Sequence, residues 1–167
     1  MSGLLVPNIE CTESVENFGR FVAEPLEKGF VVTLGNSLRR VLIGYLRGAA
    51  VTQVRIEGVH HEFTFIPNAT EDVLEFLHNV KELRLKPLSD RGGTLILEVQ
   101  GAQRVCASDI KPSADFEITN PELCLITINT PDARLYVELD VELGMGFKTA
   151  ESTDNMSVGT IPVDALF

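Results

Sequence analysis

The sequence predicts a globular protein that mixes helices and strands, and three observations lead to this fold class. The chain has 167 residues, which corresponds to roughly one domain. Hydrophobic residues make up 44% and charged residues 23%, a balance typical of globular proteins rather than of disordered chains, collagen or coiled-coil rods. Two segments have helical periodicity, and they stand among many segments with strand periodicity.

The first predicted elements are a strand and a long amphipathic helix. Residues 18–22 have a strand pattern that ends before Pro25, because proline lacks the N–H group that a sheet ladder needs. We expect Thr33 to cap a helix that runs to about Leu46, with Gly48 placed to end it. One stripe of this helix is apolar at about 100° per residue. Its members are Leu34, Leu38, Val41, Leu42, Tyr45 and Leu46.

The opposite side of this helix is polar, with an isoleucine in its middle. Its members are Asn36, Arg40, Ile43 and Arg47. A solvated helix face explains such a stripe. An interface also explains it, because arginine and apolar neighbours are enriched in interface cores whereas lysine and glutamate are depleted. The residues alone favour the solvated face.

Two strands and a second helix are expected next. The patterns predict strands at residues 51–56 and 61–65, with a turn at residues 57–58. Asn68 is expected to cap the helix, because Glu71 stands three residues later as in a capping box. The predicted buried face consists of Val73, Leu74, Phe76, Leu77 and Val80. The side chains expected to point outward are Glu71, Glu75, His78 and Glu82.

From Arg84 onward every pattern is β. A turn at residues 90–93 leads into a strand at residues 94–99. Residues 135–142 alternate apolar and polar side chains, which is typical of a half-buried strand. The polar segment at residues 149–159 is expected to be a mobile loop.

No motif for catalysis, cofactor binding or metal binding is present in the sequence. Phosphate-binding loops, dinucleotide-binding glycine patterns and zinc-protease patterns are all missing. His60 and His61 are adjacent on a predicted strand, so their side chains face opposite ways and share no metal. Glu138, Asp140 and Glu142 lie on one strand face and suggest a divalent cation site, although a solvated face explains them better. We therefore expect no catalytic residue, metal or cofactor.

Charge, cysteine content and hydropathy limit the classes of partner. Fourteen basic against 24 acidic residues give a net charge of −10, which argues against nucleic-acid binding by this chain. Cys11, Cys106 and Cys124 are far apart, so we expect three reduced thiols in a cytoplasmic protein. No apolar run approaches the roughly 18 residues of a membrane span, and no signal peptide is expected at the first residues.

Several ordered segments resemble the amino-terminal region of the bacterial RNA polymerase alpha subunit family. They are residues 25–30 (PLEKGF), 33–40 (TLGNSLRR), 50–52 (AVT), 58–63 (GVHHEF), 71–75 (EDVLE) and 79–81 (NVK). Weaker matches are residues 107–110 (ASDI) and 161–165 (IPVDA). The segments keep their order and cover essentially the whole chain, which is more specific than any single short motif.

The resemblance implies an α+β assembly scaffold with two lobes. A dimerisation lobe with one long amphipathic helix begins in residues 1–47. It is interrupted by an inserted, mostly antiparallel β lobe with one helix, in residues 48–167. In this family the amino-terminal region dimerises and recruits the large beta and beta-prime subunits. The partners implied are therefore a second copy of the chain and those two subunits, without a cofactor.

The resemblance also gives the helical stripes roles. It implies that the apolar stripe Leu34, Leu38, Val41, Leu42, Tyr45 and Leu46 contributes to the dimer interface. It implies that Arg40 holds a large subunit, and Asn36, Ile43 and Arg47 share its stripe. Lys81 and Val163 stand where the family approaches a large subunit, and plain structural roles are equally open for both. Arg39 lies at the edge of the stripe, where a solvated role is favoured.

The match has a limit, and two other function classes remain open. The family continues with the rest of the dimerisation lobe and a DNA-binding carboxy-terminal domain, so the chain is expected to be a fragment that does not bind DNA. A free-standing adaptor domain with the same fold is one alternative, which a pulldown of the large subunits would distinguish. A metal-dependent enzyme that uses Glu138, Asp140 and Glu142 is the other.

Overall fold

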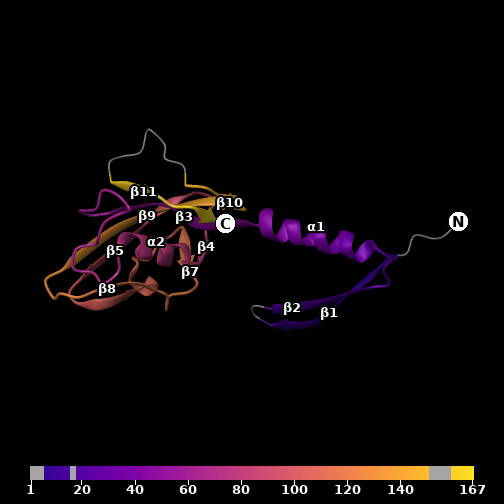
Figure 1. Ribbon diagram of the computed structural model, residues 1–167. Coiled ribbons are helices and arrows are strands. Elements are labelled where there is room, and N and C mark those ends of the chain that lie inside the picture. Colours follow the sequence, from indigo (N-terminus) through magenta and orange to yellow (C-terminus); the bar gives the residue numbers. More distant parts are fainter. Residues whose placement is uncertain (1–5, 16–17, 151–158) are drawn as a thin grey trace. The chain divides into compact units, whose positions relative to one another are not determined.

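The computed structural model describes residues 6–15, 18–150 and 159–167 of the chain (Figure 1). By its internal contacts the chain divides into two compact units, Met1–Ile43 and Gly44–Phe167. Helices and antiparallel strands are both present in the described residues, so the predicted α+β class is confirmed. The assignment of residues 1–47 and 48–167 to an interrupted lobe and an inserted lobe stays a prediction.

The first unit contains a β-hairpin and most of a long helix. Strand β1 (Asn8–Val15) pairs antiparallel with β2 (Phe18–Glu24), and helix α1 spans Phe30–Gly44. The predicted cap at Thr33 is wrong. Gly29 has a φ of 88°, which turns the chain directly into the helix, and the Phe30 N–H donates to the Glu27 carbonyl oxygen at 3.0 Å.

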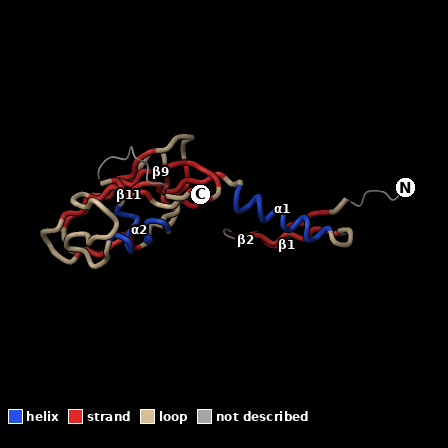
Figure 2. The backbone as a smooth tube through the Cα atoms, turned by 45° about the horizontal axis from the view of Figure 1, so that its top comes forward, coloured by secondary structure: helices blue, strands red, loops and turns tan. Residues whose placement is uncertain are grey.

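The second unit is built on a curled antiparallel sheet (Figure 2). Six described strands belong to it, in the order β5-β9-β3-β4-β7, with β11 also paired to β3. Their bounds are β3 (Arg47–Ile56), β4 (Leu85–Pro87), β5 (Gly93–Gln100), β7 (Phe116–Ile118), β9 (Arg134–Met145) and β11 (Thr160–Pro162). Strand β3 is central, because β9 covers one of its edges while β4 and β11 share the other.

Smaller elements complete the second unit. Two further antiparallel pairs are β6 (Gln103–Cys106) with β8 (Cys124–Ile128), and β10 (Phe147–Lys148) with β12 (Ala165–Leu166). A single 3-10 turn, η1 (Ala107–Asp109), follows β6. The expectation of a wholly β pattern after Arg84 therefore holds apart from this turn.

Helix α2 (Val73–Lys81) contacts both β3 and β8, and the core lies around it. Phe76 of α2, Val54 of β3, Ile126 of β8 and Leu139 of β9 are fully buried. Four of the five side chains predicted for the buried face of α2 are buried, but Leu74 is 49% exposed. The core is aliphatic apart from its phenylalanines, and burial of each such side chain contributes about 1.5–3 kcal/mol to folding.

The start of α2 differs from the prediction. Asp72, and not Asn68, is the N-cap, since its carboxylate accepts a hydrogen bond from the Glu75 N–H at 2.8 Å. Asn68 has a φ of 63° and lies in the preceding loop. Glu71 does not point away from the protein, because its carboxylate accepts from the N–H and the hydroxyl of Thr127 at 2.7 and 3.0 Å.

Two other predicted segments have different outcomes. Residues 61–65 form bends rather than a strand, with one isolated bridge between Phe65 and Asp72. The turn at residues 57–58 is present, and Gly58 has a φ of 79°. The predicted loop at residues 149–159 falls mostly outside the described residues.

Two glycines face each other near the start of β3 and the end of β9. Gly48 of β3 is paired with Gly144 of β9. A Cβ atom on Gly144 would lie 2.6 Å from the ring of Phe167, and one on Gly48 would lie 2.9 Å from the Phe167 backbone. The Phe167 N–H donates to the Gly146 carbonyl oxygen at 2.9 Å. The absence of a side chain on Gly144 therefore leaves room for the Phe167 ring, and its absence on Gly48 leaves room for the Phe167 backbone.

Among the described residues, neither α1 nor α2 has the length and apolar character needed to cross a membrane.

Candidate functional site

The apolar stripe of α1 is exposed. Within the first unit none of the described helix residues is buried. Leu38, Val41 and Leu42 are 54%, 50% and 62% exposed, and Leu34 is half-buried. Clustered exposed apolar side chains of this size are typical of protein–protein interaction sites.

The hairpin of the first unit adds further exposed apolar side chains. Ile9 of β1 and Phe21 of β2 are 67% and 68% exposed. Strand β1 was not predicted from the sequence, although Ile9 and Cys11 alternate with polar residues there. That alternation, and the apolar residues of β2, were the available indications of a second apolar surface.

Two arginines on α1, Arg39 and Arg40, differ in their partners among the described residues. Arg39 donates a hydrogen bond from Nη2 to Oδ1 of Asn36 at 3.1 Å, so the two side chains are bonded within the helix. Arg40 is exposed, and no acidic group in the described part of the chain forms an ion pair with it. Ile43 is 66% exposed on the same helix. An exposed guanidinium with an exposed aliphatic neighbour can bind a carboxylate on a partner protein.

The last three residues assigned to the helical stripes lie outside α1. The helix ends at Gly44 and not at Leu46, so Tyr45 and Leu46 occupy the connection to β3, where they are 66% and 55% exposed. Arg47 is the first residue of β3, and its Nη1 atom lies 2.9 Å from Oδ1 of Asp90. Its predicted place on the helical stripe is therefore wrong.

Lys81 and Val163 lie at one surface of the second unit but differ in character. Lys81 ends α2, and its Nζ atom lies 3.3 Å from Oδ2 of Asp164. The Ala150 N–H donates to the other oxygen of Asp164 at 2.7 Å, and this bond together with Lys81 lowers the pKa of the Asp164 carboxyl. The side chain of Val163 is only 6% exposed, and its N–H donates to the Thr52 carbonyl oxygen at 2.9 Å.

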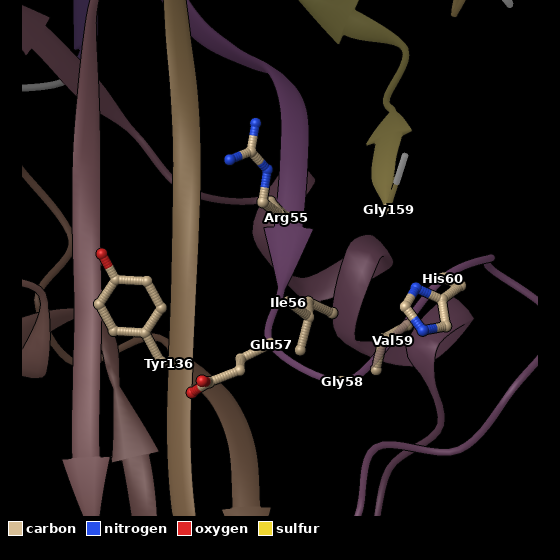
Figure 3. A pocket seen from close by; sticks show the side chains of 8 residues that line it. All are labelled: Arg55, Ile56, Glu57, Gly58, Val59, His60, Tyr136 and Gly159. Atoms are coloured by element: carbon tan, nitrogen blue, oxygen red, sulfur yellow. The ribbon is translucent and has the colours of Figure 1, made fainter. Parts of the chain in front are cut away.

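A hollow lies where β3 ends and β9 begins (Figure 3). Residues that line it include Arg55, His60 and Tyr136. In Figure 3 the Tyr136 ring and the His60 ring lie at opposite ends of the hollow. The Tyr136 hydroxyl donates to Oε1 of Glu138 at 3.1 Å, which raises the pKa of Tyr136. These side chains do not converge as a nucleophile and a base would.

The three carboxylates of β9 each have a partner in the protein. Oε2 of Glu138 lies 3.2 Å from Nη1 of Arg55, and Oδ1 of Asp140 accepts from the Thr94 hydroxyl at 2.6 Å. Glu142 forms an ion pair with Lys148. Among the residues that the structure describes, no group of three or more His, Cys, Asp or Glu side chains could hold a metal ion. These carboxylates give the metal-enzyme alternative no support.

Comparison with protein families identifies the fold. The model of the RNA polymerase Rpb3/RpoA insert domain matches residues 54–167. The chain belongs to this family. The resemblance drawn from the sequence is thereby confirmed, and the matched residues are those of the main sheet, α2 and the β6-β8 pair.

Curated relatives of this RpoA-family chain extend the similarity to its first residues. It is 57% identical over 167 residues to the DNA-directed RNA polymerase subunit alpha of Dehalococcoides mccartyi (strain ATCC BAA-2266), which covers 100% of this chain and 51% of the relative. It is 49% identical over 165 residues to that of Desulforudis audaxviator, with 96% and 52% covered. It is 43% identical over 167 residues to that of a Roseiflexus species, with 100% and 52% covered. The chain spans about half the length of these relatives.

Proposed function

We propose that this chain is part of the alpha subunit of a bacterial DNA-directed RNA polymerase and acts as a non-catalytic assembly scaffold. The observation that carries the proposal is the 57% identity to an alpha subunit along the whole chain. The exposed apolar and cationic side chains of α1 support it, because a scaffold needs surfaces that are left for partners.

The apolar stripe is proposed as the dimer interface with a second copy of the chain. Leu38, Val41 and Leu42 are large and half or more exposed, which is unfavourable unless a partner covers them. Leu34 belongs to the same helix, and Tyr45 and Leu46, which follow α1 in the connection to β3, are proposed to contribute exposed apolar side chains as well. The proposal keeps the division into a first part of a dimerisation lobe, residues 1–47, and an inserted lobe, residues 48–167.

Arg40 is proposed as the main contact to a large subunit, with Asn36 and Ile43 beside it. Its guanidinium is exposed and has no ion-pair partner among the described residues, so it can form a bidentate pair with a carboxylate. Lys81 is proposed as a second contact through its exposed end. Arg47 is already paired with Asp90 and Val163 is buried, which supports structural roles for these two residues.

The same proposal assigns no chemistry to this chain. The His60 and Tyr136 side chains do not converge, and the acidic balance of the sequence opposes contact with DNA phosphates. Nucleotide transfer would belong to the large beta and beta-prime subunits, and the chain would need no cofactor.

A co-purification experiment tests the scaffold function. The tagged chain would be mixed with the beta and beta-prime subunits of the same polymerase and recovered by its tag. We expect a complex that contains two copies of the chain, and no nucleotide incorporation by the chain alone. Failure to retain either large subunit by a folded chain would overturn the scaffold assignment, and incorporation without them would overturn the non-catalytic one.

A further inference from the structure

Two cysteines that are 18 positions apart in the sequence face each other across the β6-β8 pair. Cys106 ends β6, Cys124 begins β8, and the two are register partners. The neighbouring partners Val105 and Ile126 are fully buried, which fixes this register. Both cysteines are free thiols, and both residues are half-buried rather than buried.

The surrounding hydrogen bonds show whether Cys106 and Cys124 form a hydrogen-bonded or a non-hydrogen-bonded antiparallel pair. The N–H of Ala107 donates to the Leu123 carbonyl oxygen at 2.8 Å, just beyond the two cysteines. The N–H of Cys106 donates to Oδ2 of Asp109 at 2.8 Å and not to its opposite partner. These are the features of a non-hydrogen-bonded antiparallel pair, in which the Cα atoms are about 4.5 Å apart. A disulfide accepts Cα separations of about 4.4–6.8 Å.

Both side chains project from the same face of the ribbon. Cys106 stands between Val105 and Ala107, which are both 0% exposed, so its own side chain points away from the core. Cys124 is followed by the fully buried Leu125, which gives Cys124 the same outward direction. A register shift between Val105 and Cys106 leaves Leu125 without a partner and keeps the two cysteines directly opposite.

Arg104 lies on the same face, two residues before Cys106. The pKa of Arg104 is raised, chiefly by hydrogen bonding to the Cys124 side chain. Charge interactions with Cys124 and, to a smaller extent, with Cys106 act in the same direction. Arg104 therefore interacts with both cysteine side chains on this face of the ribbon.

We propose that Cys106 and Cys124 form a dithiol site that a peroxide oxidises reversibly to an intramolecular disulfide. One thiol releases its proton, and its thiolate attacks a peroxide oxygen; the O–O bond breaks, a sulfenic acid forms, and the leaving hydroxide takes up the released proton to give water. The second thiol releases its proton, and its thiolate attacks the sulfenic sulfur; the S–O bond breaks as the S–S bond forms, and the leaving hydroxide takes up that proton to give a second water. Overall, two thiols and one hydrogen peroxide give one disulfide and two waters. A dithiol reductant reverses the oxidation by thiol–disulfide exchange.

Oxidation of the purified, reduced chain with hydrogen peroxide tests the proposal. Remaining thiols would be counted with a thiol reagent in denaturant, and peptides would be mapped by mass spectrometry without reduction. Of the three thiols, the wild-type chain should lose two and yield a crosslinked peptide pair that contains residues 106 and 124. Dithiothreitol should restore all three thiols.

Single serine variants provide matched controls. Cys11→Ser removes the exposed third thiol and should still form the intramolecular crosslink at the wild-type rate. Cys106→Ser and Cys124→Ser should retain a native circular dichroism spectrum and lose the crosslink. The proposal is overturned if the wild-type chain keeps both thiols, forms only crosslinks between chains, or proceeds to sulfinic acid at Cys106 or Cys124 without an S–S bond.

Discussion

Substitution of Arg40 by alanine should impair assembly with a large subunit without affecting folding. Arg40 is exposed on α1 and forms no ion pair among the described residues, so its removal leaves no buried group unsatisfied. Such surface substitutions change the free energy of unfolding by about 0.5 kcal/mol or less. Truncation of one partner of a buried interfacial charge pair typically costs about 2–5 kcal/mol. The dissociation constant for the large subunit should therefore increase by a factor between about 30 and several thousand.

Arg39→Ala is the matched control for this prediction. Arg39 stands next in the same helix, carries the same charge and donates to Asn36 within the helix. Its loss should weaken assembly by less than Arg40→Ala does. Binding of the large subunits would be measured by titration of each variant, with circular dichroism as the control for folding. Equal affinities for the wild type and Arg40→Ala, or a larger loss in Arg39→Ala, would refute the assignment of Arg40.

Three further predictions concern the dimer, the core and the acid stability. Leu42→Glu places a charge on the exposed apolar stripe and should shift the chain from dimer to monomer in analytical ultracentrifugation, while a dimer of unchanged affinity would contradict the proposed interface. Phe76→Ala empties a fully buried site in α2 and should lower the free energy of unfolding by about 3–5 kcal/mol in urea titrations. The pKa values of Glu98 and Asp164 are lowered in the folded chain, chiefly by the Lys111 hydrogen bond and by the Ala150 N–H respectively. These two carboxylates should contribute fully to the free energy of unfolding at a pH above their ordinary pKa values of 4.5 and 3.8, and the contribution should be lost as the pH falls through their lowered pKa values. Urea titrations at a series of acid pH values would measure this loss, and a free energy of unfolding that does not change with pH would contradict it.

Periodicity predicted the helices well where one face is buried. For α2 it located the element and four of the five buried side chains, because the core imposes the spacing. It predicted Asn68 as the cap, whereas Asp72 caps the helix, and both residue types can do so. The prediction relied on Glu71 as the second member of a capping box, but the Glu71 carboxylate is held by Thr127, 56 residues later in the chain. A local pattern contains no information on such a distant partner.

The missing strand at residues 61–65 has a similar cause. Phe63 and Phe65 alternate with polar residues as in a half-buried strand, yet they are 75% and 80% exposed. A strand needs a neighbouring strand for its backbone hydrogen bonds, and here the structure supplies only one bridge, between Phe65 and Asp72. Alternation alone shows which side chains could share a face, but not whether another strand is available.

Helical spacing correctly placed the stripe residues up to Ile43 on α1 and misplaced those that follow the end of the helix at Gly44. Leu38, Arg40 and Ile43 lie on α1 and are exposed. Arg47 was placed on the same stripe only because the helical wheel was continued past Gly44, whereas β3 begins there and Asp90 holds the side chain. The pairing of Cys106 with Cys124 could not be predicted either, because it depends on the register of two strands that η1 and β7 separate in the chain.

The glycine pair at positions 48 and 144 limits which sequences this fold accepts. Strand positions usually favour β-branched residues, and a glycine there is usually improved by a larger side chain. At Gly144 even one methyl group would meet the aromatic ring of Phe167 at 2.6 Å, so alanine would displace the ring from the end of the sheet. Neither glycine has a positive φ, which means that space and not backbone conformation requires them. A library of variants at these two positions should therefore return glycine. Variants of Phe167 with small side chains should relax that requirement at Gly144 but not at Gly48, where the Phe167 backbone is the neighbour.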